Sequence, residues 1–202
     1  MTHHEVMHKT NLNDIDQYVR MGTTRVRVRG RVVALHEVAH ALQALELGYD
    51  LELVRIGRHR DPEGHLVAGS ILLTHESHAR LDLNPLDSVK VSLAGPAAEF
   101  QEIRRLPGVD FDPYLRSQGQ PGQPWSLDFE QVVVALRPDL ADTELTVDLA
   151  LEIVRMPLLE ALEHHDDTRM TLLRSLRDEL VRRASMNGEQ FADEIEYQKG
   201  QR

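Results

Sequence analysis

Residues 29–47 have the sequence RGRVVALHEVAHALQALEL. Their apolar side chains recur at the three- and four-residue spacing of an α-helix, and Gly48 follows as a typical C-terminal stop. Apolar residues cover much of the helix circumference, so we expect this helix to be buried. The rest of the chain must therefore pack around a helix whose centre carries two histidines and a glutamate.

These polar residues form the pattern His36-Glu37-x-x-His40. Side chains four positions apart project from one face of a helix, so both imidazoles can bind one metal ion. Zinc prefers such neutral nitrogen ligands, and Glu37 is placed to accept a proton from a water that attacks a carbonyl. Two histidines that are merely buried are the less favoured interpretation, because His36, Glu37 and His40 would lack partners. A third ligand must come from elsewhere in the chain.

The segment that follows this helix predicts a β-hairpin. Residues 51–57 and 65–73 have strand-like composition, and Asp61-Pro62-Glu63-Gly64 between them has the Pro-early, Gly-late chemistry of a turn. Together with the helices predicted downstream, this hairpin indicates a mainly α fold with a small β element.

Two helices are expected after the hairpin. Asn84-Pro85 resembles an N-cap followed by a first-turn proline and opens a helix to about Leu106, and Ser126 can cap a helix that ends near Leu136. Residues 107–124 are rich in Pro, Gly and Gln and predict an irregular connection.

The remainder, from residue 143, is helical in pattern. Breaks are expected near Pro157, at residues 164–167, which would form a polar helix end, and at residues 187–188. We therefore expect an N-terminal arm at residues 1–24, with a short helix near residues 14–20 as the alternative. A single domain would span residues 25–202, with a core at about 29–136 and a helical tail at 143–198.

Composition excludes several classes of site. The 202 residues contain no cysteine, which rules out disulfides, thiolate metal sites and cysteine nucleophiles. A formal charge of −10 and an aromatic content of 4% argue against nucleic acid as the principal ligand. No apolar run approaches the roughly 20 residues of a membrane span and no secretory signal is evident, so we expect no membrane association and a cytoplasmic location.

One basic cluster precedes the histidine helix. We interpret it primarily as a solvated helix entry, and the alternative is a dock for an acidic or phosphate-bearing partner. Its members are Arg20, Arg25, Arg27, Arg29 and Arg31.

Three blocks of this sequence resemble the peptidase domain of the membrane-anchored AAA metalloproteases, peptidase family M41. They are His36-Glu37-Val38-Ala39-His40-Ala41-Leu42, residues 91–99 (VSLAGPAAE) and residues 126–131 (SLDFEQ). The likeness covers about residues 32–195. The AAA module and membrane anchor of that family have no counterpart here, and Pro96 stands where the family has an arginine.

The resemblance implies a zincin-like metallopeptidase domain. It makes His36 and His40 zinc ligands, Glu37 the catalytic base and Asp128 the third ligand. Glu99 is the rival third ligand. If Asp128 binds the metal, Glu99 would instead orient His36 or His40 through the free ring nitrogen, and a surface pairing with Arg104 or Arg105 is its structural alternative.

The resemblance also implies a function. We expect a zinc-dependent endopeptidase that acts on flexible or unfolded polypeptide, or that receives substrate from a separate ATPase or adaptor. We expect it to act without ATP because the sequence contains no Gly-rich phosphate loop of the nucleotide-binding type. The substrate would lie extended along the hairpin edge. The alternative is a zinc-binding regulatory protein that has lost hydrolysis, and the oligomeric state is left open. The expected substrate-binding residues are Leu66, Val67, Ala68, Gly69 and Ser70.

Overall fold

The computed structural model describes residues 17–21, 24–28, 30–60, 66–104, 109–120, 125–140 and 146–201. The described part is mainly helical with a small antiparallel sheet, as the sequence predicts, and it contains a second small antiparallel sheet that the sequence does not predict. It contains no helix that is long and apolar enough to cross a membrane.

The histidine helix is α1, Gly30–Glu46. Its boundaries lie within one residue of those predicted, and Gly48 beyond its end has φ of +82°, a conformation that glycine adopts without steric cost. All of its residues from Val33 to Leu42 are buried. The expectation of a buried helix is confirmed.

The predicted hairpin is also present. Strands β3 (Leu51–Arg60) and β4 (Leu66–Leu73) pair antiparallel, and the short strand β5 (Ser185–Asn187) pairs with the other side of β3. The order β4-β3-β5 leaves β4 at an edge of the sheet. The expected turn at residues 61–64 lies outside the described residues.

A second hairpin replaces the helix considered near residues 14–20. Strands β1 (Gln17–Met21) and β2 (Thr24–Val28) pair antiparallel, so the helical alternative is wrong where the chain is described. Valine alternates with arginine from Arg25 to Val28, and such β-branched alternation favours a strand over a helix. Residues 1–16 of the expected arm lie outside the described part.

Helices α2 (His75–Asp82) and α3 (Pro85–Ile103) follow β4. Asn84 occupies the N-cap position of α3, but its side chain donates to the Arg80 carbonyl oxygen and does not cap the helix. Helix α5 (Ser126–Leu136) has the predicted bounds, although its N-cap residue is Trp125 and not Ser126.

The expected irregular connection at 107–124 is wrong for residues 111–118. These residues form α4 (Phe111–Gln118), and its hydrophobic side chains Tyr114 and Leu115 are buried against the neighbouring helices. Burial of this apolar face favours a helix in a segment whose composition predicts none.

The C-terminal part contains the short 3-10 helix η2 (Pro138–Leu140) and the helices α6 (Val147–Glu163), α7 (Asp167–Arg183) and α8 (Gly188–Gly200). The break at 164–166 is confirmed, but His165 within it is buried and not part of a polar end. The break expected near Pro157 is wrong, because α6 continues through it with Val154 and Leu158 fully buried on either side.

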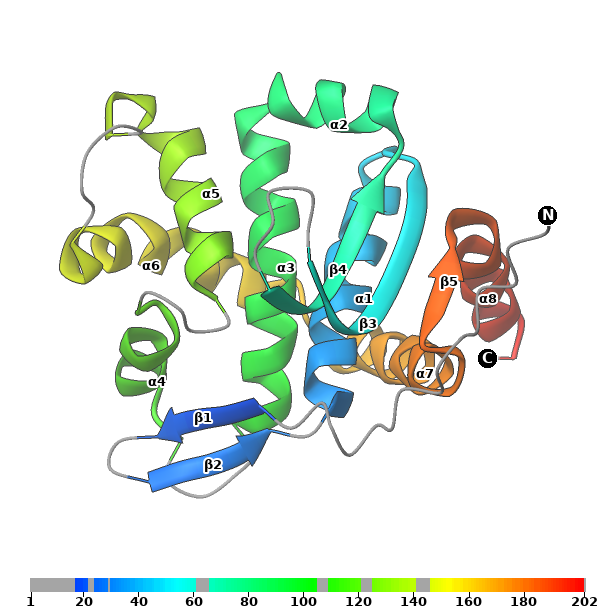
Figure 1. Ribbon diagram of the computed structural model, residues 1–202, viewed down its shortest axis with the longest axis horizontal. Helices are drawn as coiled ribbons and strands as arrows, with labels where there is room; N and C mark the ends of the chain where they lie inside the picture. Colours follow the sequence, from blue (N-terminus) through cyan, green and yellow to red (C-terminus); the bar gives the residue numbers. More distant parts are fainter. Residues whose placement is uncertain are drawn as a thin grey trace, which may run out of the picture.

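Helix α3 stands between the two halves of the molecule (Figure 1). On one side, α1, the three-stranded sheet, α7 and α8 enclose the first core, and on the other, α4, α5 and α6 enclose the second. The candidate site lies where α1, α3 and α5 meet, between these two cores. Central members of the cores are Leu35, Val54, Leu173 and Phe191 in the first and Phe100, Trp125, Phe129 and Leu158 in the second.

Candidate metal centre

Helix α1 brings two imidazoles to one face. His36 and His40 are 8% and 6% exposed, and their ring centroids lie 4.6 Å apart. Because they are four residues apart in a regular helix, the rings stand one turn from each other and face the same neighbours.

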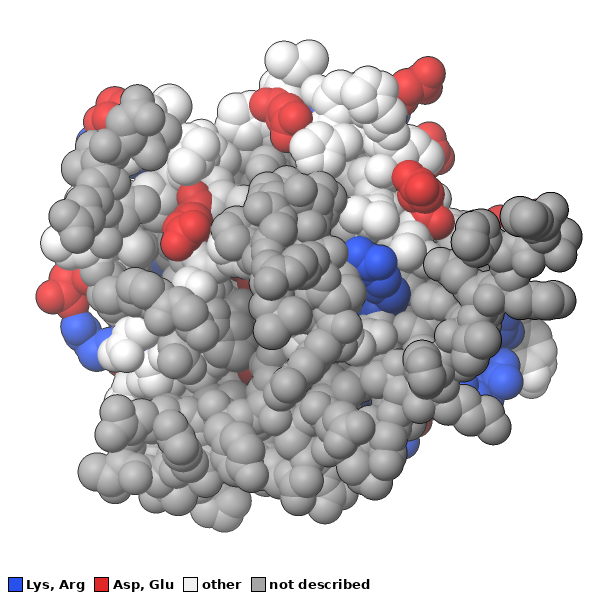
Figure 2. Space-filling view, in the orientation of Figure 1, with Lys and Arg blue, Asp and Glu red and all other residues white. Residues whose placement is uncertain are grey.

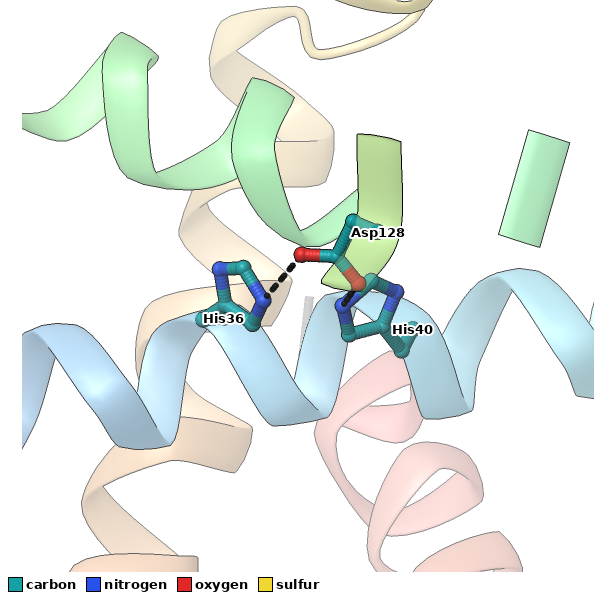
Figure 3. Close-up of side chains that lie close together, drawn as sticks. All are labelled: His36, His40 and Asp128. Carbon is teal, nitrogen blue, oxygen red and sulfur yellow. Dashed lines mark ion pairs between the residues drawn. The ribbon is translucent and has the colours of Figure 1, made fainter. Parts of the chain in front are cut away.

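Asp128, from the first turn of α5, faces both imidazoles (Figure 3). Its Oδ2 lies 3.2 Å from His36 Nε2 and its Oδ1 lies 3.4 Å from His40 Nε2. Among the described residues, these three form the group of side chains whose ligand atoms could hold a metal ion, within 4.8 Å of one another. Two ligands of a tetrahedral zinc at about 2.0–2.1 Å are separated by roughly 3.3 Å, which is close to both histidine–Asp128 separations.

Both histidines have a partner on the ring nitrogen that faces away from Asp128. His36 Nδ1 lies 3.2 Å from Glu99 Oε2, and His40 Nδ1 donates to the Val91 carbonyl oxygen at 2.6 Å. With a proton on Nδ1, the neutral form of each imidazole carries its lone pair on Nε2. This is the tautomer that a metal requires when Nε2 is the ligand atom.

Glu99 therefore lies on the far side of the His36 ring from Asp128. It is 3% exposed and makes its contact with Nδ1, so it does not join the convergent ligand atoms. The structure places it beside His36 Nδ1, the position considered for an orienting residue, and not in a surface pairing with Arg104; Arg105 lies outside the described residues.

Two glycines let neighbouring elements approach the histidine helix closely. A β-carbon on Gly95 of α3 would lie 2.8 Å from His36 Nε2, and one on Gly69 of β4 would lie 2.6 Å from Glu37 Cγ and Oε1. Any side chain at either position would displace the residues of the site. Glu37 thus lies between α1 and the edge strand of the sheet.

The charges of the site favour a cation. Glu37, Glu99 and Asp128 surround two imidazoles, and no Lys or Arg of the described part forms an ion pair with them. Burial opposes protonation of His36, but the carboxylates of Asp128, Glu99 and Glu37 together outweigh it and raise the pKa of His36 well above its usual value. A metal ion at the convergent ligand atoms would supply the positive charge that this proton otherwise provides.

The other two titratable groups of the motif are shifted by burial. Burial lowers the pKa of His40 to about 4 and raises the pKa of Glu37 to about 7. A neutral His40 is a competent ligand, and a carboxylate whose pKa lies near neutrality has the proton affinity of a general base.

The expected substrate-binding residues all belong to β4. The side chains of Leu66 and Val67 lie outside the described part of the structure. Ala68, Gly69 and Ser70 are half-buried. Ser70 Oγ accepts a hydrogen bond from Arg55 Nε on the neighbouring strand. Because β4 is an edge strand, its outer backbone groups are not paired within the three-stranded sheet.

The arginine cluster is described only in part. Arg31 is exposed and pairs with Asp178 at 3.0 Å, which agrees with a solvated helix entry at that residue. The side chains of Arg20, Arg25, Arg27 and Arg29 lie outside the described part. On the face drawn in Figure 2, the described basic side chains form small separate groups.

Sequence reasoning missed two residues near the centre, Tyr114 and Trp125. The Tyr114 hydroxyl donates to Glu99 Oε1 at 2.7 Å, and Trp125 Nε1 donates to Glu99 Oε2 at 3.0 Å. The available signal was that Trp125, the single tryptophan of the chain, comes three residues before Asp128.

Comparison with models of known protein families gives no match, and comparison with curated proteins gives none. The resemblance to peptidase family M41 therefore stays a prediction based on the motifs themselves.

Proposed function

We propose that this chain is a zinc-dependent metallopeptidase with a zincin-like domain, hydrolysing peptide bonds in flexible or unfolded polypeptide without ATP. The observation that carries the proposal is the convergence of His36, His40 and Asp128 beside Glu37. The two nitrogens and one carboxylate would hold the zinc ion, and three protein ligands are typical of catalytic zinc, which keeps a further position open.

When bound, zinc would polarise the peptide carbonyl and make a water molecule more acidic. Glu37 would accept the proton of the attacking water and pass it to the leaving amine, which breaks the peptide bond. The Glu99 carboxylate and the Val91 carbonyl oxygen would hold the two imidazoles in orientation throughout. Because Glu37 donates the proton it has taken up, it returns to its starting state after each turnover.

The edge strand β4 supports the same proposal. A substrate in extended conformation could pair with its outer backbone groups, and Gly69 keeps that strand close to Glu37. Backbone pairing recognises extended chain and not a particular sequence, which favours flexible or unfolded segments as substrates. A separate ATPase or adaptor would be needed for folded ones.

The test is metal analysis of the purified chain combined with digestion of an unfolded reporter protein. We expect about one zinc per chain, cleavage that a chelator abolishes, and recovery when zinc is restored. Zinc without any cleavage would contradict the peptidase proposal and favour a zinc-binding regulatory protein. Absence of zinc binding would contradict both.

A further inference from the structure

Glu99 is a buried carboxylate whose partners come from three different parts of the chain. Its Oε1 accepts from the Tyr114 hydroxyl of α4, and its Oε2 accepts from Trp125 Nε1 and faces His36 Nδ1 of α1. A buried carboxylate is destabilising unless it is fully hydrogen-bonded. No Lys or Arg among the described residues pairs with it, so Tyr114, Trp125 and the His36 imidazole are the groups that stabilise it.

These contacts determine which nitrogen of His36 carries a proton. An indole N–H can only donate, so Trp125 identifies Glu99 Oε2 as an acceptor. His36 Nδ1 faces the same oxygen at 3.2 Å and must then carry a proton, so Nε2 is the nitrogen that a cation can bind in place of the second proton.

The two donors are themselves held firmly. The rings of Tyr114 and Trp125 pack edge to face with centroids 5.1 Å apart, and Trp125 packs in turn on Phe129 at 5.8 Å. Trp125 is fully buried and Tyr114 is 3% exposed. Burial and the Glu99 carboxylate raise the pKa of Tyr114 well above its usual value, so its hydroxyl remains a donor at physiological pH.

We infer that Tyr114 and Trp125 are positioning residues of the metal centre: they hold Glu99 against His36 Nδ1 and so keep His36 Nε2 directed at the metal. The inference rests on the metal site of the proposed function, but it does not require hydrolysis.

The position of Trp125 connects the hydrogen bonds around Glu99 with Asp128, the proposed third ligand. Trp125 is the N-cap residue of α5, and Asp128 lies in the first turn of the same helix. The start of α5 is thus attached to α1 twice, through Asp128 to both imidazoles and through Trp125 and Glu99 to His36. Loss of either attachment would change the arrangement of the proposed ligand atoms of His36, His40 and Asp128.

The inference is tested with Tyr114→Phe and Trp125→Phe in the full chain. Each substitution removes one donor to Glu99 and keeps an aromatic ring in the core. Tyr49→Phe is the matched control, because the buried Tyr49 hydroxyl donates to the Asp87 carboxylate and that pair makes no hydrogen bond to either histidine. The measured quantities are the zinc dissociation constant, from competition with a chelator, and the melting temperature of the metal-free protein.

We expect Tyr114→Phe and Trp125→Phe each to weaken zinc binding about tenfold or more, while Tyr49→Phe leaves it unchanged. A role in folding alone would lower the melting temperature in all three variants without a selective loss of zinc affinity. Zinc affinity within about twofold of wild type in both test variants would overturn the inference.

A second measurement does not depend on any variant. Trp125 is the single tryptophan, so its indole N–H gives a single side-chain ¹H–¹⁵N signal. Zinc should shift this signal, because Trp125 and His36 share Glu99 Oε2, and an unchanged signal at full zinc occupancy would contradict the coupling.

The two proposals fail in different ways. Wild-type protein that binds zinc tightly but cleaves nothing defeats the peptidase and leaves the positioning role intact. Active protein whose two variants bind zinc as tightly as wild type defeats the positioning role and leaves the peptidase intact.

Discussion

Gly69 of the edge strand β4 lies against the Glu37 side chain of α1, so closely that a β-carbon at residue 69 would come within 2.6 Å of Glu37 Cγ and Oε1. This contact connects the edge strand, along which an extended substrate would pair, with Glu37, the proposed general base. It requires glycine because the obstructed atoms belong to a buried side chain with little room to move.

We expect Gly69→Ala to displace Glu37 and to lower kcat/KM by about 10²-fold, since an error of about 1 Å in a catalytic group has that effect. Zinc content should stay near that of wild type because the proposed ligands His36, His40 and Asp128 are unchanged. Peptide hydrolysis and metal analysis on the same preparation measure the two effects. Gly200→Ala is the control, because its new methyl group meets no atom within 4 Å, and equal activity of both variants would contradict the prediction.

Glu37→Gln separates the base from the ligands. The amide cannot accept the proton of the attacking water, so we expect activity to fall by about 10²- to 10⁴-fold while zinc remains bound. The same change at the exposed Glu160 of α6 controls for loss of one charge. Loss of zinc from Glu37→Gln would make Glu37 a ligand, and retained activity would remove its catalytic role.

The third ligand is identified by comparing Asp128→Ala with Glu99→Ala. Asp128 contacts both Nε2 atoms, whereas Glu99 contacts His36 Nδ1, so zinc occupancy should fall sharply in Asp128→Ala. Glu99→Ala should weaken zinc binding by about 10- to 100-fold. Zinc titration of both variants decides the assignment, and a larger loss in Glu99→Ala would give Glu99 the ligand role.

Local patterns predict α1 and the β3–β4 hairpin well, because their apolar periodicity and their stop signals agree. Helix α4 is missed, because Pro113 and the surrounding Gly and Gln conceal a helix that packing of Tyr114 and Leu115 stabilises. Propensity alone cannot reveal a helix whose stability is tertiary.

The same contrast between local patterns and tertiary packing applies to the candidate site. His36, Glu37 and His40 follow from spacing on one helix, whereas Asp128 was assigned by resemblance because residue 128 is far from the motif in sequence. The donors to Glu99 were not predicted, since Tyr114 and Trp125 lie 15 and 26 residues from it and no local rule relates them. Such contacts are determined by how α3, α4 and α5 pack.

A buried histidine outside the site predicts a pH dependence of stability. His165, between α6 and α7, is 4% exposed; its Nδ1 donates to the Ala161 carbonyl oxygen, and its Nε2 has no hydrogen-bond partner. Burial lowers the pKa of His165 to about 4, and the nearby Arg169 and His164 act in the same direction. Protonation of Nε2 would place an unpaired charge in the interior.

The unfolded chain therefore binds a proton near pH 6.5, whereas the folded chain binds it only near pH 4. Stability from this residue is fully present above pH 6.5 and falls as the pH decreases toward 4, by about 3 kcal/mol in total. His165→Asn keeps a donor for Ala161 and cannot titrate, so its unfolding free energy should decline less steeply over this range. Urea unfolding at several pH values measures the difference. The neighbouring exposed variant His164→Asn should follow wild type, and parallel curves for His165→Asn and wild type would show that His165 is not the group responsible.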